Sequence, residues 1–574
     1  NNTPRQFQVG TNETYVAVAT RVHELFKQAC LADPTIFPEL ITINLSDKKI
    51  VEVVKVLQDI CITDTSVDNI GAAFEIFFGS VFRGELGQYF TMRPLSRFTV
   101  AMLDIKHEHY VIDPTCGSGG FLLEVLLQVW NKLDRDYAGR RELERIKTDF
   151  ALNQVYGIEI HDILARICKI NLLLHHDGHT NIEGDKSCLD TEFTKERLKL
   201  GKENFNVVVG NPPFGDTIKE GDEDQLGKSS LEDFEVSAGR SQIPSEHIIV
   251  EKSIKMLKDD GLLGLVLPDG VFNNQGELSN CPLLRNYLVK QGRVLAVVSL
   301  PDYAFRKSGA QNKTSILFFK KFNYDQRTAF ENAYDAQIAN GASDEQAIIA
   351  ALSANPYRVF MAEANFIGYS STGALMEKND LYRGSAGGHL DDDQSETILG
   401  EYRRFCVDPE NYIPALNDCI GLDICSVWNA HESHRLDPKY HLFKVQEEQT
   451  LPEGWVSKKL SELMQRREEI VRPQETPEAP VVEWRGMYFE DSPSTWYKAH
   501  QGDLVYSSID LWKGCIAVVP EQFNDALVTK EFPIYRMLTD EIDPEFLAIL
   551  LRSRYYQRAF RAITTGHSNR RRTQ

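Results

Sequence analysis

Four short apolar runs, each ending in a polar residue or a tight turn, constrain the fold of this chain more than any other feature. They end at Asp113, at Glu159, at Gly184–Asp185 and at Asn211, and the last run is Asn206 to Gly210 (N-V-V-V-G). A continuous apolar run bounded by turn residues is typical of a strand buried on both faces. Helical stretches alternate with these strands, which predicts an α/β fold: a doubly wound, mostly parallel sheet covered by helices on both faces.

The first run leads into a glycine-rich loop, Asp113 to Leu122 (D-P-T-C-G-S-G-G-F-L), and then into an apolar helix. Glycines let the backbone approach a ligand closely, and a helix N-terminus follows. A dinucleotide fingerprint would have its third glycine near Leu122, so the loop does not match that motif. Glu159, after the second run, suits two ribose hydroxyls, and Asp185, after the third, suits an adenine amine. The pattern predicts a site for an adenosine-containing cofactor.

The last run ends in the tetrapeptide Asn211 to Phe214 (N-P-P-F). The side-chain oxygen of Asn211 and a backbone carbonyl of the loop can accept both hydrogens of an exocyclic amine. The prolines hold the turn and leave no competing N–H there, and Phe214 offers a ring face for stacking on a base. An isolated N-P-P-F is equally compatible with an ordinary turn. The cofactor pattern upstream favours an amine-binding site.

These motifs, in this order, resemble those of the amino-methyltransferases of DNA, specifically the gamma-ordered group. They are most similar to the modification (M) subunits of type I restriction systems. Gly84 to Pro94 (G-E-L-G-Q-Y-F-T-M-R-P) resembles the G-Q-F/Y-F-T-P-R element of the family, with Met92 where the family usually has proline. Gly261 to Phe272 and Ser299 to Phe319 resemble later family strands. The likeness extends from about residue 20 to residue 410.

The resemblance implies transfer of a methyl group from S-adenosyl-L-methionine to N6 of a flipped-out adenine in DNA. It implies catalytic roles for Asn211, Pro212, Pro213 and Phe214. It implies cofactor binding by Gln88, Tyr89, Phe90, Thr91, Asp113, Thr115, Gly117, Ser118, Gly119, Phe121, Glu159, Ile160 and Asp185. In this interpretation the glycine loop cradles the methionine end of the cofactor, and an aromatic ring nearby favours the positive charge of the sulfonium.

Two alternatives stay open beside an active N6-adenine DNA methyltransferase. The same kind of loop serves other amines, so the acceptor could be N4 of cytosine or a glutamine amide. The chain could also be a DNA-recognition and assembly subunit whose methylase site is silent without a specificity partner.

The charge of the chain is unevenly distributed. A net charge of −20 argues against a simple DNA-binding protein. Leu551 to Gln574, however, contains seven arginines and no acid. A locally basic face on an acidic body is compatible with DNA binding. The predicted DNA-binding residues are Lys498, Lys513, Arg570, Arg571 and Arg572. A solvated helix end and ordinary strand packing are the alternative explanations for these side chains.

The C-terminal part resembles a target-recognition unit of a restriction specificity subunit. The stretches that carry this looser likeness are His434 to Tyr440, Gly502 to Ser507, Lys513 to Val519 and Asp543 to Leu547. The expected partners are double-stranded DNA, a specificity subunit or fused recognition domain, and a restriction (nuclease or translocase) subunit. Such units usually continue beyond a point like Gln574, and the chain begins without Met. A longer natural polypeptide, with a nuclease upstream, is therefore one interpretation.

The predicted organisation has four parts. Residues 1–100 form a helical N-terminal domain, with helices at Tyr15 to Leu31, Lys48 to Ile60 and Asn69 to Phe82. Residues 101–410 form the methyltransferase domain, with a helical insertion at 329–354. Residues 411–482 form a connecting segment and linker, and residues 483–574 a mixed α+β recognition domain.

Several other function classes are disfavoured. Ten cysteines without paired spacing suggest a reduced, cytoplasmic setting, and no membrane segment or signal peptide is visible. Cys419, Cys425, His431 and His434 do not have a zinc-binding spacing, so no metal is expected. Gly221 to Ser229 superficially resembles a phosphate loop, but its length and its acids exclude that role. We expect a mobile loop there that could close over DNA.

Overall fold

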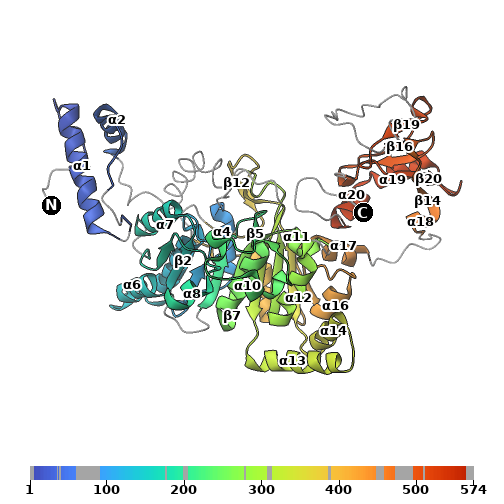
Figure 1. Cartoon of the computed structure of the whole chain (residues 1–574), viewed down its shortest axis with the longest axis horizontal. Coiled ribbons are helices and arrows are strands. Elements are labelled where there is room, and N and C mark those ends of the chain that lie inside the picture. Colours follow the sequence, from blue (N-terminus) through green and yellow to red (C-terminus); the bar gives the residue numbers. More distant parts are fainter. Residues whose placement is uncertain are drawn as a thin grey trace.

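The structure, a computed structural model, describes residues 6–34, 36–37, 41–59, 91–174, 178–197, 205–276, 279–306, 313–384, 389–447, 458–471, 496–508 and 511–563. Figure 1 shows three parts in chain order: a pair of N-terminal helices, a central body built on one large sheet, and a smaller C-terminal unit.

A nine-stranded sheet forms the central body, in the order β13-β10-β8-β9-β7-β4-β1-β2-β3. Its strands are β1 (Val111–Asp113), β2 (Val155–Glu159), β3 (Ile182–Gly184), β4 (Phe205–Gly210), β7 (Leu257–Pro268), β8 (Gly292–Ser299), β9 (Thr314–Lys321), β10 (Arg358–Glu363) and β13 (Cys419–Asp423). All of them run in one direction except β9 and β13, which are antiparallel to their neighbours. The predicted doubly wound, mostly parallel sheet is confirmed.

Both faces of this sheet are buried, which explains the continuous apolar run in β4. Val207 and Val209 belong to the hydrophobic cluster on one face, and Val208 belongs to the cluster on the other. The first cluster is covered by α4 (Arg93–Met102), α5 (Gly120–Asp136), α6 (Leu143–Asn153), α7 (Asp162–Leu174) and α15 (Ile398–Val407). The second is covered by α10 (Ser245–Met256), α12 (Cys281–Gln291), α13 (Tyr324–Ala339), α14 (Asp344–Ala354) and α16 (Ile424–Asn429).

The strand order reverses between β1 and β4, because β2 and β3 lie on one side of β1 and the rest of the sheet on the other. In an open α/β sheet, the carboxyl ends of the strands at such a switch point border a ligand-binding crevice. Here β1 ends at Asp113, β2 at Glu159 and β4 at Gly210, directly before Asn211. The parallel topology therefore brings these strand ends to one edge of the sheet.

The acidic segment after Phe214 is folded, so the expectation of a mobile loop is wrong. It contains β5 (Thr217–Lys219), α9 (Glu223–Leu226), the 3-10 turns η1 (Leu231–Asp233) and η2 (Glu235–Ser237), and β6 (Gln242–Pro244), and β5 pairs with β6. Its apolar residues Leu226, Leu231, Phe234 and Val236 are buried in the core of the body. The acids therefore lie on the outer surface of a packed element.

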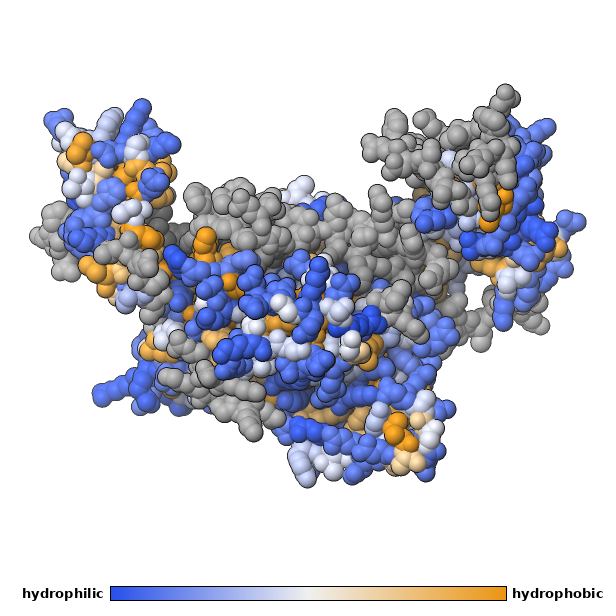
Figure 2. Space-filling model, viewed as in Figure 1, coloured by the Kyte–Doolittle hydropathy of each residue, from blue (hydrophilic) through white to orange (hydrophobic). Residues whose placement is uncertain are grey.

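The N-terminal helices α1 (Tyr15–Ala32) and α2 (Asp47–Leu57) pack together through Val18, Val22, Ile50 and Val54. Both helices agree with the sequence prediction, whereas the third predicted helix, residues 69–82, lies outside the described residues. Figure 2 shows hydrophobic side chains on the surface of this pair as well. The helix α4 (Arg93–Met102) begins within the predicted N-terminal domain, residues 1–100, and packs in the core of the central body.

The C-terminal unit is a mixed α+β element with two small sheets, of order β14-β20-β17-β18 and β15-β16-β19. Its elements are α18 (Leu460–Leu463), β14 (Met464–Arg467), β15 (Ile470–Val471), β16 (Trp496–Ala499), β17 (Leu504–Tyr506), β18 (Ile516–Val518), β19 (Ala526–Val528), β20 (Ile534–Met537), α19 (Pro544–Leu551) and α20 (Arg554–Ile563). Among the described residues, no helix is both long and apolar enough to cross a membrane.

The stretch from His434 to Tyr440 packs on the central body and precedes the helix α17 (Pro438–Glu447). The N–H of Leu436 donates to the carbonyl of Phe272 at 2.9 Å, and Leu436 is fully buried. Arg435 also donates to the carbonyl of Ala562 in α20 at 2.7 Å. This stretch therefore joins the body to the C-terminal unit, within the predicted connecting segment.

Candidate active site

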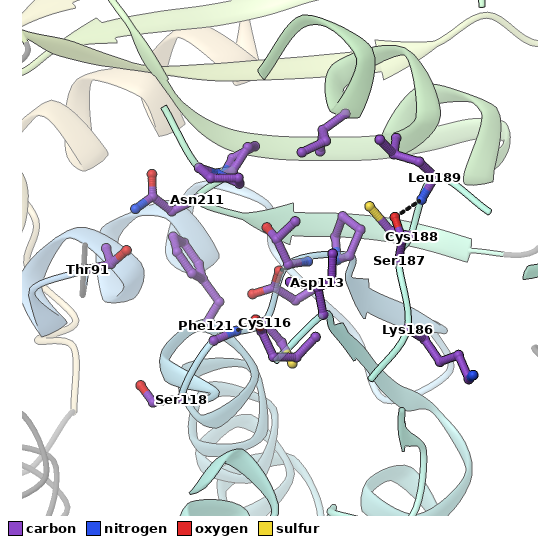
Figure 3. A pocket seen from close by; sticks show the side chains of 18 of the residues that line it. Thr91, Asp113, Cys116, Ser118, Phe121, Lys186, Ser187, Cys188, Leu189 and Asn211 are labelled. Atoms are coloured by element: carbon purple, nitrogen blue, oxygen red, sulfur yellow. Dashed lines mark hydrogen bonds between the residues drawn. The ribbon is translucent and has the colours of Figure 1, made fainter. Parts of the chain in front are cut away.

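A cleft lies at the carboxyl ends of β1, β2 and β4. Figure 3 shows Thr91 and Asn211 on one side of it, Ser187, Cys188 and Leu189 on the other, and Asp113 between them. The lining residues are Thr91, Asp113, Pro114, Thr115, Cys116, Gly117, Ser118, Gly120, Phe121, Glu159, Ile160, Lys186, Ser187, Cys188, Leu189, Asn211, Pro212, Pro213, Phe214, Gln225 and Ile249. The cleft thus coincides with the switch point of the sheet.

The glycines of the loop have two different roles: Gly119 allows close packing against α7, and Gly117 and Gly120 leave open space beside the backbone. Gly119 has a φ of +84°, and a Cβ there would lie 2.7 Å from the Sγ of Cys168, so the loop packs closely against α7. Gly117 also has a positive φ, +53°, but a Cβ there would meet nothing within 4 Å. Gly120, which begins α5, is equally open. The loop therefore leaves open backbone on the cleft side.

The carboxyl group of Asp113 is almost fully buried at the floor of the cleft. Its Oδ1 accepts a hydrogen bond from the N–H of Thr115 at 3.0 Å, and a Cβ on Gly210 would lie 2.7 Å from the same oxygen. Burial, reinforced by the nearby Glu159 carboxylate, raises the pKa of Asp113 to about 8, although the Thr115 N–H opposes this shift. Asp113 is therefore largely protonated at neutral pH.

This raised pKa predicts how replacing Asp113 changes stability. The unfolded chain releases the proton near pH 4 and the folded protein near pH 8, so this group makes stability fall as pH rises between those values. We expect Asp113→Asn, which keeps an oxygen for the Thr115 N–H, to gain stability relative to the original protein between pH 5 and pH 8. Thermal unfolding of both proteins at several pH values measures this, and a difference independent of pH would contradict it.

Glu159 joins the two loops that follow β1 and β2. Its Oε2 accepts from the N–H of Gly117 at 2.9 Å, and its Oε1 accepts from the N–H of His161 at 3.0 Å. Only 3% of its surface is exposed. The carboxylate is therefore held in a defined orientation beside the glycine loop.

The N-P-P-F loop presents an unpaired acceptor to the cleft. The Oδ1 of Asn211 is buried and has no hydrogen-bond partner among the described residues. The carbonyl of Pro213 accepts from the hydroxyl of Ser245 at 3.0 Å, which ties the loop to the start of α10. The ring of Phe214 packs edge-on against Phe305, with centroids 6.3 Å apart, and borders the cleft. An amine donor entering the cleft would satisfy the Asn211 oxygen.

Most of the predicted cofactor residues border the cleft, with specific exceptions. Gly119 lies behind the lining and supports the loop. Asp185 is exposed, has a φ of +57° and is not among the lining residues. Gln88, Tyr89 and Phe90 lie outside the described residues. The following loop, Lys186 to Leu189, lines the cleft where Asp185 was expected.

Sequence reasoning missed the residues on the far wall of the cleft: Lys186, Ser187, Cys188, Leu189, Gln225 and Ile249. Their positions depend on how two loops and α10 pack. Residues 186–189 directly follow the predicted end of the third strand, and this position could have marked them as cleft residues. No comparable pattern marks Gln225 or Ile249 in the sequence.

The predicted DNA-binding lysines lie in the C-terminal unit. Lys498 is close to two acids, 3.9 Å from Glu469 and 4.0 Å from Asp525, and Lys513 is exposed. The three arginines at 570–572 lie outside the described residues. These five DNA contacts stay predictions.

The cysteines and histidines do not form a second site in the described ranges. No group of three or more metal-ligating side chains occurs among those residues. Cys116 lines the cleft, but a hydrogen bond with Cys168 and burial raise the pKa of its thiol well above the usual range. A thiol that stays protonated is a poor nucleophile, which agrees with a packing role.

Comparisons with known proteins place the cleft in a family context. Residues 65–350 match the family described as N-6 DNA Methylase. The chain is 27% identical, over 42% of its own length and 43% of the relative, to the type I restriction enzyme EcoEI methylase subunit of Escherichia coli. It is 28% identical, over 45% of each chain, to the type I restriction enzyme MpnII methylase subunit of Mycoplasma pneumoniae. The chain thus spans less than half the length of these relatives.

Among solved structures, the chain resembles one from work on complex assembly and conformational transition of the type I R-M system. The two share 18% sequence identity with a TM-score of 0.48, over 73% of this chain and 75% of the other.

Proposed function

We propose that this chain, which belongs to the N-6 DNA methylase family, transfers a methyl group from S-adenosyl-L-methionine to N6 of an adenine flipped out of double-stranded DNA. The observation that carries the proposal is the buried Oδ1 of Asn211, which has no hydrogen-bond partner among the described residues and lies beside a cleft at the switch point of the sheet. The catalytic roles of Asn211, Pro212, Pro213 and Phe214 are part of this proposal.

The residues around the cleft suit the cofactor. The open faces of Gly117 and Gly120 leave room for a ligand against the loop backbone, and the Oγ1 of Thr115 is a second buried polar atom without a partner among the described residues. Glu159 would accept hydrogen bonds from ribose hydroxyls, as acids at this strand end do in related nucleotide sites. When bound, S-adenosyl-L-methionine would supply a methyl group activated by a positively charged sulfur.

The N-P-P-F loop would activate the amine of the target base. The lone pair of an aromatic amine is delocalised into the ring, which makes the nitrogen a poor nucleophile. Asn211 Oδ1 and the carbonyl of Pro212 can accept its two hydrogens and draw the nitrogen toward tetrahedral geometry. The Pro213 carbonyl is already bonded to Ser245, whereas no hydrogen bond within the described part of the chain reaches the Pro212 carbonyl.

No strong general base is required, because the amine becomes acidic once its new bond to carbon has formed and then releases one proton to solvent. The chain contributes position and electrostatics: two acceptors held by a rigid loop, and a ring, Phe214, beside the base. Phe305 supports Phe214 edge-on and so holds the stacking face in place.

We further propose that the C-terminal unit takes part in DNA recognition and that a specificity subunit, and a restriction subunit in turn, assemble with this chain. The relatives named above are methylase subunits of type I restriction enzymes. The mixed α+β unit is joined directly to the body, since Arg561 of α20 forms an ion pair with Glu363 at the end of β10, 3.0 Å apart. This attachment holds the unit at the edge of the sheet where β10 ends.

A methyl-transfer assay tests the proposed function. The full chain is incubated with radiolabelled S-adenosyl-L-methionine and mixed-sequence duplex DNA, which is then digested to nucleosides. We expect the label in N6-methyladenosine. Label in N4-methylcytosine would contradict the base assignment, and label in protein would contradict the DNA substrate. If the cofactor binds but no label appears until a specificity subunit is added, the isolated chain is not the active species.

A further inference from the structure

The acidic segment that follows the N-P-P-F loop forms one wall of the cofactor cleft. The chain leaves the cleft after Phe214, folds into β5, α9, the two 3-10 turns and β6, and returns at Ser245. Within this excursion, Gln225 of α9 lines the cleft. The sequence pattern of this segment predicted neither a packed element nor a ligand contact. The position of this wall therefore depends on how the segment packs in the folded protein.

Four residue pairs hold α9 and the three residues after it against the loop that follows β3 and the start of α8 (Thr191–Arg197). The hydroxyl of Ser187 donates to the carbonyl of Gln225. The hydroxyls of Thr191 and Ser229 are 2.9 Å apart, and Ser229 also accepts from the N–H of Thr191. The backbone at Gly227 packs tightly on Asp190, and Lys228 forms an ion pair with Glu192 at 2.6 Å. The two loops therefore act as one continuous wall.

The backbone of Gln225 is held in place while its side chain remains available. Its N–H donates to the capping carboxylate of Asp222 at 3.2 Å, and the neighbouring Leu226 is fully buried. The carboxamide of Gln225 makes no hydrogen bond with any other described residue and is half-buried at the cleft. Two apolar side chains, Ile160 and Ile249, belong to the same lining.

We infer that Gln225 binds the adenine ring of the cofactor, a step that rests on the proposed function. The edge of adenine offers an amine donor beside a ring-nitrogen acceptor, and a primary carboxamide offers the complementary acceptor and donor. Asp185, which the sequence pattern favoured for this contact, is exposed and outside the lining. Since α9 lies in the segment that directly follows the N-P-P-F loop, this contact would place a cofactor ligand in the same part of the chain as the residues that hold the target amine.

The experiment measures the affinity of the full chain for S-adenosylhomocysteine by calorimetry. We expect Gln225→Met, which preserves side-chain length and removes both polar groups, to weaken binding about tenfold. The matched control is Glu223→Met, which places the same side chain on the exposed side of α9, and we expect binding within about twofold of the original protein.

A second ligand separates a lost contact from a general disturbance of the wall. The analogue whose purine lacks the 6-amino group should bind the original protein about tenfold more weakly than S-adenosylhomocysteine. The Gln225→Met protein should bind the two ligands alike. Equal affinity of original and variant for S-adenosylhomocysteine, or unchanged discrimination in the variant, would overturn this inference alone. Absence of binding to the original protein would instead overturn the proposed function together with it.

Discussion

Asn211→Ala is expected to lower the rate of methyl transfer by at least about a hundredfold while leaving cofactor affinity within about twofold. The substitution removes the buried oxygen that has no partner among the described residues, and with it one of the two acceptors for the target amine. The cofactor, in contrast, would be held by the loops after β1, β2 and β3. Single-turnover transfer of label and calorimetry with S-adenosylhomocysteine measure the two effects separately.

Two further variants define what the Asn211 result means. Asn211→Asp keeps an acceptor oxygen at the same place and should retain part of the rate that the alanine variant loses. Asn153→Ala makes the same truncation at the exposed end of α6 and should leave both measurements unchanged. If cofactor affinity falls as steeply as the rate in Asn211→Ala, the division of labour between the two loops is wrong.

Gly119→Ala is expected to lower the free energy of unfolding by about 2 to 4 kcal/mol and to weaken cofactor binding at least tenfold. The added Cβ would sit 2.7 Å from the Sγ of Cys168, and a φ of +84° is unfavourable for alanine in any surroundings. Relief of the overlap requires the loop to move away from α7, and the loop carries Gly117 and Ser118 to the cleft. The midpoint of thermal unfolding and calorimetry with S-adenosylhomocysteine measure both losses.

The neighbouring glycine and the facing cysteine provide the controls for Gly119. Gly117→Ala has open space around its Cβ and should cost only the backbone strain, about 1 kcal/mol. Adding Cys168→Ala to Gly119→Ala removes the sulfur atom that the new Cβ meets, so it should restore part of the lost stability. A Gly119→Ala protein as stable as the original, or no recovery in the double variant, would show that the loop is not pressed against α7.

The strand ends of the candidate site were predictable because each is a local pattern. An apolar run followed by Asp113, Glu159 or Asn211 marks the end of a buried parallel strand whatever the rest of the chain does. The carboxyl ends of parallel strands meet at one edge of a sheet, so their order along the chain already implied a shared cleft. The resemblance to a known family then assigned a chemistry to each of these ends.

The acidic segment shows where local reasoning failed. Its charged residues suggested a mobile loop, but Leu226, Leu231, Phe234 and Val236 are buried in the core. These four residues follow neither the helical nor the strand period, because short turns carry them into the core one at a time. The periodicity of hydrophobic residues detects long, regular helices and strands. It does not detect an irregular segment that packs through single, unevenly spaced apolar residues.

The sequence by itself determined the doubly wound sheet, the glycine loop and the N-P-P-F turn, because hydrophobic pattern and turn chemistry act over a few neighbouring residues. Only the tertiary structure decided the far wall of the cleft, where Ser187 meets Gln225 and Asp185 is left outside. Contacts between loops so far apart in the chain depend on how each loop packs on the sheet. That packing is a property of the whole core, which no short stretch of sequence encodes.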